Sequence, residues 1–212
     1  MRKYRRKMKL LWIAAIGVIA AAGVYGGDKK DDGRFVPGPA SSYSSKQTND
    51  NITIAAVPYD TEELAHKAFG KVNPYQHGVL PVLVIIQNDT PEALRLDHLQ
   101  LEYEGLHGDR VENTPAGDVQ YIGSSPKQPR PNVGSPIPTG VFKKKNPLAE
   151  YEITGRAFSV KMLPPHESAN GFFYFQAQSA PGAKLYLTGV TVASNGKGIL
   201  YFEIPLATDA RP

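Results

Sequence analysis

The apolar run from Val79 to Ile86 is the clearest pattern in the chain. It reads VLPVLVII, so that apolar residues occupy both alternating sets of positions. A strand buried on both faces shows this pattern, whereas a strand with one exposed face alternates apolar and polar residues. We therefore predict a central strand of a β-sandwich here. Because proline cannot donate a ladder hydrogen bond, we expect the strand to enter the sheet only after Pro81.

Shorter strand patterns surround this run. Residues 51–57 alternate as a half-buried strand does. In residues 94–104 the apolar parity shifts by one position at Asp97, which predicts a β-bulge. The Asn195-Gly196 pair between two apolar runs is the strongest hairpin signal. Further strand patterns lie at 156–163, 171–177, 184–192 and 199–206. We predict seven or eight short strands, a number typical of an all-β sandwich.

Two helical segments interrupt the strand patterns. Residues 60–69 place apolar side chains on one helical face, and Asp60 followed by Glu63 has the spacing of a capping box. Gly70 stands where this short amphipathic helix should end. The segment NPLAEYEI predicts a further helical turn that opens at Pro147.

A long loop rich in proline and lysine covers residues 124–147. It holds six prolines, five basic residues and no acidic residue. A loop of this length in a compact domain is functional or disordered. Its charge would suit contact with an anionic surface such as lipid head groups or cell-wall polymer, or with an acidic partner, and the alternative is a solvated linker. The candidate contact residues are Lys127, Arg130, Lys143, Lys144 and Lys145.

The N-terminus has the composition of an export segment. A basic stretch precedes sixteen uncharged residues from Leu10 to Tyr25. This run is shorter than the ~20 residues of a comfortable membrane span, and Ala20 and Ala22 form a small-x-small cleavage site. Two alternatives stay open, a cleaved signal peptide and a retained anchor in the cytoplasmic membrane formed by residues 10–25. In both, the positive-inside rule places the following chain outside the cytoplasm, in the periplasm or secreted.

The chain divides by composition into three parts. We predict an export segment or anchor at 1–25, a flexible linker at 26–50 and one β-sandwich domain at 51–207 that carries the loop. The net charge of +4 belongs to the N-terminus, because six of the 24 basic residues lie in the first nine positions. The remaining 18 basic residues and the 20 acidic residues give the rest of the chain a net charge of −2. The domain therefore lacks the positive field that nucleic-acid binding requires.

Candidate chemistry is sparse. The chain has no cysteine, which excludes disulfides, a thiol nucleophile and thiolate metal sites. It also has no nucleophile elbow and no phosphate-binding glycine loop. If the segment after residue 97 brought His98 near His107, these imidazoles and Asp109 could bind a metal, and the alternative is an exposed turn without a site. No cofactor is indicated, and we predict a protein that is not an enzyme.

Two motifs resemble those of exported bacterial immunoglobulin-like domains of unknown function. The first, VLVIIQNDT, is a strand that ends in Asn-Asp-Thr before a turn. The second, LPPHESANGFFYF, departs from the family pattern at His166, which replaces a glycine. The resemblance covers residues 51–206 and implies an immunoglobulin-like β-sandwich in the cell envelope, with no catalytic residues to transfer. The positions that match the second motif are Leu163, Pro165, Glu167, Gly171 and Phe175.

Together these observations predict a non-enzymatic, exported β-sandwich that acts as an interaction or accessory module in the bacterial cell envelope. Its partner would be an envelope protein or an anionic surface, with membrane contact through the N-terminal segment if that is uncleaved, and nucleic acid is not expected. The oligomeric state is not indicated. The alternative is a small-ligand or metal-binding envelope protein, and a hydrolase is the third hypothesis.

Overall fold

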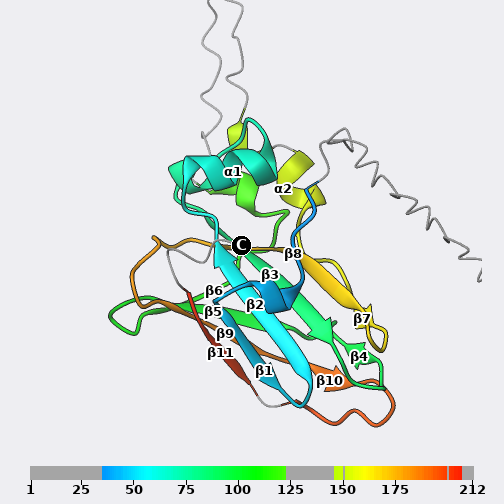
Figure 1. Ribbon diagram of the computed structural model, residues 1–212. Coiled ribbons are helices and arrows are strands. Elements are labelled where there is room, and N and C mark those ends of the chain that lie inside the picture. Colours follow the sequence, from blue (N-terminus) through cyan, green and yellow to red (C-terminus); the bar gives the residue numbers. More distant parts are fainter. Residues whose placement is uncertain (1–34, 123–145, 150, 200, 207–212) are drawn as a thin grey trace, which may run out of the picture. The chain divides into compact units, whose positions relative to one another are not determined.

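The computed structural model describes residues 35–122, 146–149, 151–199 and 201–206. In these residues eleven strands form three sheets (Figure 1). The predicted all-β sandwich is confirmed, although the strands are more numerous than seven or eight. The strands are β1 Lys46–Asn49, β2 Ile52–Pro58, β3 Leu80–Asn88, β4 Leu94–Arg95, β5 Gln100–Glu104, β6 Arg110–Glu112, β7 Met162–Leu163, β8 Ser168–Phe175, β9 Lys184–Thr188, β10 Thr191–Val192 and β11 Phe202–Pro205.

The helices are short. The predicted helix is confirmed as α1, but Thr61 caps it instead of Asp60, because the Thr61 hydroxyl accepts a hydrogen bond from the Leu64 amide at 3.3 Å. The turn predicted at Pro147 is also confirmed. Within the described segments, no helix has the length and apolar character needed to cross a bilayer. The helices are α1 Glu62–Phe69 and α2 Tyr151–Gly155, with 3-10 turns η1 Ala40–Ser42, η2 Pro74–His77, η3 Val119–Tyr121 and η4 Pro147–Ala149.

Two four-stranded sheets form the sandwich, the first in the order β1-β2-β3-β8 and the second in the order β11-β9-β5-β6. The main core lies between them, and a second apolar layer with α1 and α2 covers the other side of the first sheet. Strand β3 pairs with β2 and β8 and is buried on both faces, as predicted. Val82 and Val84 belong to the main core, whereas Leu83 and Ile85 belong to the second layer.

Pro81 lies inside strand β3, so the prediction that the strand begins after it is wrong. Pro81 pairs with Tyr174 of β8, and its carbonyl accepts a hydrogen bond from the Tyr59 amide at 2.8 Å. The Tyr174 carbonyl receives a hydrogen bond from the Thr114 amide at 2.7 Å. Because the N–H and C=O of one residue point to the same neighbouring strand, the donor that Pro81 lacks would face Tyr59, just beyond the end of β2, so only one hydrogen bond at the end of that ladder is lost.

The parity shift at Asp97 marks a change of sheet and not the predicted β-bulge. Strand β4 belongs to a small third sheet, in the order β10-β4-β7, and β5 belongs to the second sheet. The chain makes a second such crossing between β9 and β10, at Gly189. A Cβ at Gly189 would lie 2.0 Å from the His98 carbonyl oxygen, and the φ of +88° also favours glycine. The two crossing segments are thus packed backbone to backbone.

The folded part begins earlier than predicted, because the expected linker at 26–50 is structured from residue 35. Ala40 and Tyr43 are buried, and β1 pairs with β2. Strand β1 carries only polar side chains, which is why no apolar alternation indicated it. Residues 26–34 lie outside the described part of the chain.

The two motifs that carry the family resemblance meet in space. Asn88 ends β3 and is fully buried, and its side-chain amide donates to the carbonyls of Glu92 and Pro164 at 2.8 and 2.9 Å. His166 adopts a φ of +59°. This is the left-handed conformation that a glycine would favour, so the turn is kept although histidine replaces glycine.

The aromatic run of β8 divides between the two apolar layers. Phe172 and Tyr174 lie in the second layer, and Phe175 lies in the main core. The strand predicted at 156–163 is reduced to β7. The chain before β7 crosses Gly171 so closely that a Cβ there would lie 2.4 Å from the Phe158 Cα atom.

Candidate functional site

The histidines proposed as metal ligands are not brought together. His98 precedes β5 and His107 follows it, so a five-residue strand of roughly 17 Å separates them. Asp109 lies in the same exposed turn as His107. The His98 imidazole instead lies 3.6 Å from the Asp97 carboxylate. Across the described ranges, no group of three His, Asp or Glu side chains could hold a metal ion.

The basic residues proposed to contact an anionic surface lie outside the described residues. All five belong to the segment 123–145. They are Lys127, Arg130, Lys143, Lys144 and Lys145.

The outward face of the second sheet carries a network of polar and aromatic side chains. Alternation along β5 turns Leu101 and Tyr103 into the core and leaves Glu102 outside. The strand register then places Glu102 opposite Tyr186 of β9, and Tyr186 opposite Glu203 of β11. We call this surface the aromatic–acidic face. It consists of Gln100, Glu102, Glu104, Arg110, Glu112, Lys184, Tyr186, Thr188, Tyr201 and Glu203.

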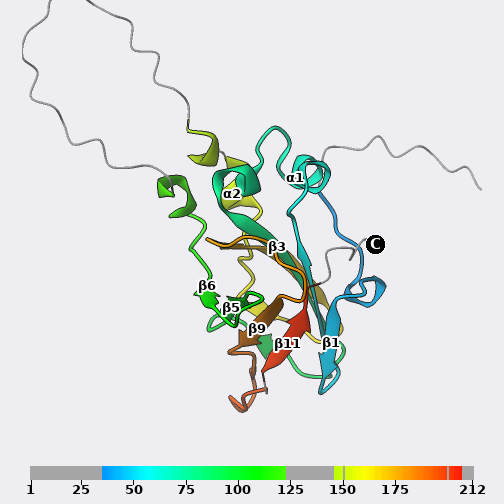
Figure 2. The ribbon, with the colours of Figure 1, turned by 90° about the vertical axis from the view of Figure 1, so that its left-hand side faces the viewer.

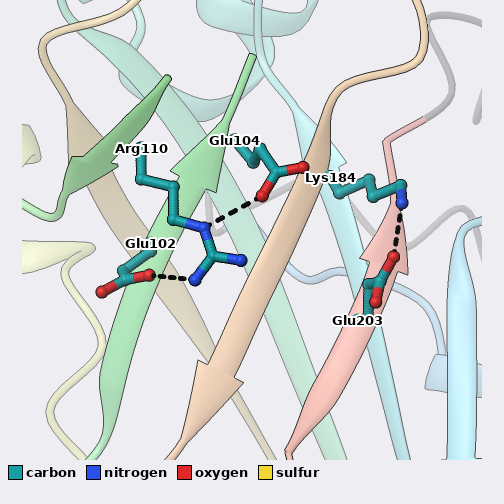
Figure 3. A network of polar contacts seen from close by, with 5 residues as sticks. All are labelled: Glu102, Glu104, Arg110, Lys184 and Glu203. Atoms are coloured by element: carbon teal, nitrogen blue, oxygen red, sulfur yellow. Dashed lines mark hydrogen bonds and ion pairs between the residues drawn. The ribbon is translucent and has the colours of Figure 1, made fainter. Parts of the chain in front are cut away.

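Ion pairs tie the strands of this face together (Figure 3). The Arg110 guanidinium lies 3.1 Å from the Glu102 carboxylate and 3.0 Å from the Glu104 carboxylate. The Lys184 ammonium lies 2.5 Å from the Glu203 carboxylate, and this hydrogen bond holds the pKa of Glu203 below its ordinary value. Because half of the Arg110 side chain is exposed, such pairs orient the side chains more than they stabilise the fold.

Two tyrosine rings lie beside this network. The Arg110 guanidinium carbon is 4.2 Å from the centre of the Tyr186 ring. Tyr186 and Tyr201 stack with ring centres 6.4 Å apart and an interplanar angle of 26°. Desolvation, and then a hydrogen bond to the Glu203 carboxylate, raises the pKa of Tyr186. Tyr201 is 55% exposed, so the face presents an open aromatic ring on a fixed support.

Two clefts meet at Tyr201. Strand β1 extends the face beyond β11, as Figure 2 shows. The Gln47 side-chain oxygen accepts a hydrogen bond from the Glu203 amide at 2.5 Å, and the Asn49 side-chain amide donates to the Tyr201 carbonyl at 3.3 Å. One cleft, of about 380 Å³, is lined by Gln100, Glu102, Arg110, Tyr186, Thr188 and Tyr201. The other, of about 620 Å³, is lined by Gln47, Thr48, Asn49, Asp50, Tyr201 and Glu203.

The side chains of this surface are suited to binding a partner. The rings of Tyr186 and Tyr201 can pack against an apolar or planar group, and the carboxylates accept hydrogen bonds. With Asp50, the surface holds five acidic residues against Arg110 and Lys184. The sequence contained part of this signal, because Tyr186 and Glu203 lie at outward positions of the hairpin runs around Asn195. The place of Arg110 over Tyr186 depends on strand order, which the pattern does not show.

Comparison with known proteins yields similar solved structures only. No family model and no curated protein matches the chain. A proposed lipoprotein of Bacillus subtilis is 14% identical over 76% of this chain and 38% of its own, with a TM-score of 0.36. A secreted protein of Mycobacterium tuberculosis, MPT63, is 11% identical over 80% of this chain and 98% of its own, with a TM-score of 0.32.

A Listeria monocytogenes protein of unknown function is 12% identical over 78% of this chain and 83% of its own, with a TM-score of 0.35. Likenesses of this size assign no family and carry no argument about activity.

Proposed function

We propose that this chain is a non-enzymatic binding module that acts outside the cytoplasm, and that an envelope protein docks on its aromatic–acidic face. The observation that carries the proposal is the stacked pair of Tyr186 and Tyr201 beside the Arg110 guanidinium on an exposed sheet face. Tyrosine and arginine are enriched at the hot spots of protein interfaces. Tyrosine combines a large apolar contact area with few rotatable bonds and a polar tip.

The location outside the cytoplasm is supported by the sequence. The basic start and the uncharged run from Leu10 to Tyr25 favour export of the chain that follows. The domain is also suited to an oxidising compartment without disulfides, because two apolar layers bury strand β3 on both faces.

The charge of the face favours a partner with basic or neutral groups. Its excess of carboxylates would repel anionic lipid head groups and anionic polymer. An anionic-surface contact therefore depends on the loop and is a separate proposal. Replacing Lys143, Lys144 and Lys145 with Gln should abolish binding to anionic vesicles if the loop makes that contact. The same change should leave docking at Tyr201 as it is.

Photo-crosslinking in living cells tests the docking face. A photoreactive amino acid at Gln100 or Thr188, both exposed on the face, should give a protein adduct. The same group at Lys161, which is exposed but far along the chain and outside the second sheet, is the matched control and should give none. The adduct should disappear when Tyr201→Ala is added. Adducts at Lys161 alone, or adducts at Gln100 that persist in Tyr201→Ala, would contradict the proposal.

A further inference from the structure

A third cleft lies on the other side of the sandwich, where α1 and the segment 35–43 cover the first sheet. Its volume is about 270 Å³. At ~30 Å³ per water molecule this is the space of about nine waters, which suits a small molecule and not a strand or helix. The cleft walls are mostly apolar, with a few polar groups, as in small-ligand sites. The apolar walls come from Phe35, Val36, Tyr43, Val57, Tyr59 and Leu64.

Tyr59 lines this cleft, and its hydroxyl makes no hydrogen bond to any described residue. The residue is only 6% exposed, and its ring packs edge-on against Phe35 and Phe172 with centre distances of 5.9 and 4.8 Å. Every side-chain oxygen that is fully buried in the described residues does have a hydrogen-bond partner. The hydroxyl oxygen of Tyr59 therefore keeps some exposure to solvent, and Tyr59 is one of the residues that line the cleft. By contrast, the Tyr174 hydroxyl donates to the Ile153 carbonyl at 2.6 Å.

The Arg156 side chain brings a positive charge close to Phe35, which lines the cleft. The Arg156 guanidinium carbon lies 5.4 Å from the centre of the Phe35 ring, and within the described chain it pairs with no carboxylate. Burial raises the pKa of Tyr59, and the charge of Arg156 opposes that rise, so Arg156 lies within electrostatic reach of the hydroxyl. At the rim, the Lys67 ammonium bonds to the Glu63 carboxylate at 2.9 Å.

We propose that this cleft binds a small apolar carboxylate, such as a medium-chain fatty acid. The chain of the ligand would pack against Phe35, Val57 and Leu64. Its carboxylate would accept the hydrogen bond that the Tyr59 hydroxyl does not make within the described residues, and Arg156 would balance its charge. Charge-assisted hydrogen bonds of this kind are stronger than neutral ones. The site belongs to the first sheet, so its failure would leave the proposed docking face of the second sheet untouched.

Calorimetric titration of the full chain with sodium decanoate, below the concentration at which it forms micelles, tests the proposal. We expect saturable binding of one molecule per chain, and binding at least tenfold weaker for 1-decanol and decylamine, which lack the carboxylate. Tyr59→Phe and Arg156→Gln should each weaken decanoate binding about five- to tenfold, the loss expected for one such interaction. Tyr121→Phe, at an exposed tyrosine elsewhere, should bind as the wild type does.

The outcome does not depend on a single variant. Tyr59→Phe should fold normally, because the Tyr59 hydroxyl makes no hydrogen bond within the described part of the chain. Leu64→Trp should fill the cleft and abolish binding of decanoate. Equal affinity for decanoate and decanol, wild-type affinity in Tyr59→Phe, or wild-type affinity in Leu64→Trp would each overturn the proposal.

Discussion

The guanidinium of Arg110 lies over the Tyr186 ring, 4.2 Å from its centre, while it bonds to the carboxylates of Glu102 and Glu104. These four side chains come from three neighbouring strands, so the register of the second sheet fixes their arrangement. Because the Tyr186 ring is already held in place, it loses little conformational entropy when a partner docks. A smaller entropy loss on binding favours affinity. Tyr201, stacked on Tyr186, extends the same support outward.

If this network serves recognition, removing it should cost little stability. Arg110→Ala should lower the free energy of unfolding by less than about 1 kcal/mol, because half-exposed ion pairs are weak. Urea unfolding measures the change, and Lys67→Ala, in an exposed pair on α1, is the matched control. A loss above about 2 kcal/mol would instead show that the network holds the fold together.

The two-sided burial of β3 predicts a large effect inside the sandwich. Ile85 is 1% exposed and belongs to the second apolar layer. Ile85→Ala should cost about 2–5 kcal/mol, since it removes buried methyl groups and leaves a cavity. Val36→Ala, at a residue that is 80% exposed, should stay within about 0.5 kcal/mol of wild type. A denaturant series that gave both variants the same midpoint would contradict this burial.

The crossing at Gly171 predicts that a single methyl group is not tolerated there. A Cβ at this position would lie 2.4 Å from the Phe158 Cα atom, so one backbone would have to move. Gly171→Ala should lose about 1–3 kcal/mol or more, as overpacked sites do. A Cβ at Gly117 would meet no atom of the described residues within 4 Å, so Gly117→Ala should unfold at nearly the wild-type temperature. Thermal unfolding of the two variants side by side checks the difference.

Buried tyrosines predict instability in alkali. Burial raises the pKa of both Tyr59 and Tyr174 above the ordinary tyrosine value of 10. Above about pH 10 the unfolded chain therefore releases these protons while the folded chain keeps them, and stability falls as pH rises further. Urea midpoints at pH 8 and at pH 11 measure the fall, which should be smaller in Tyr59→Phe. A midpoint that did not change over this range would show that the two phenols ionise alike in both states.

Sequence patterns predicted those parts of the fold that local physics decides. The run through Ile85 required burial on both faces whatever its neighbours were, and the helix before Gly70 followed from its apolar stripe and its stop. The cap was misassigned because Asp60 and Thr61 are both good N-caps, and Asp60 instead accepts a hydrogen bond from the Ser179 hydroxyl at 2.5 Å. A partner 119 residues away is invisible to a local pattern.

The features of the fold that the sequence pattern did not predict depend on which strands pair with one another. The parity shift at Asp97 fits either a bulge or a change of sheet, and only the pairing of β4 with β7 decides between them. The candidate site shows the same limit. His98 and His107 are close in sequence but stand at opposite ends of β5, whereas Arg110 and Tyr186 are distant in sequence and meet across the second sheet.

The central claim is that the aromatic–acidic face binds an envelope partner, and the affinity of the purified chain for isolated envelopes tests it most directly. Tyr201→Ala should weaken binding at least tenfold, because truncating a tyrosine hot spot costs about 2 kcal/mol or more. Tyr121→Ala, at a tyrosine that is 66% exposed outside this face, should bind within about twofold of wild type. Equal binding by wild type, Tyr201→Ala and Tyr121→Ala would contradict the account.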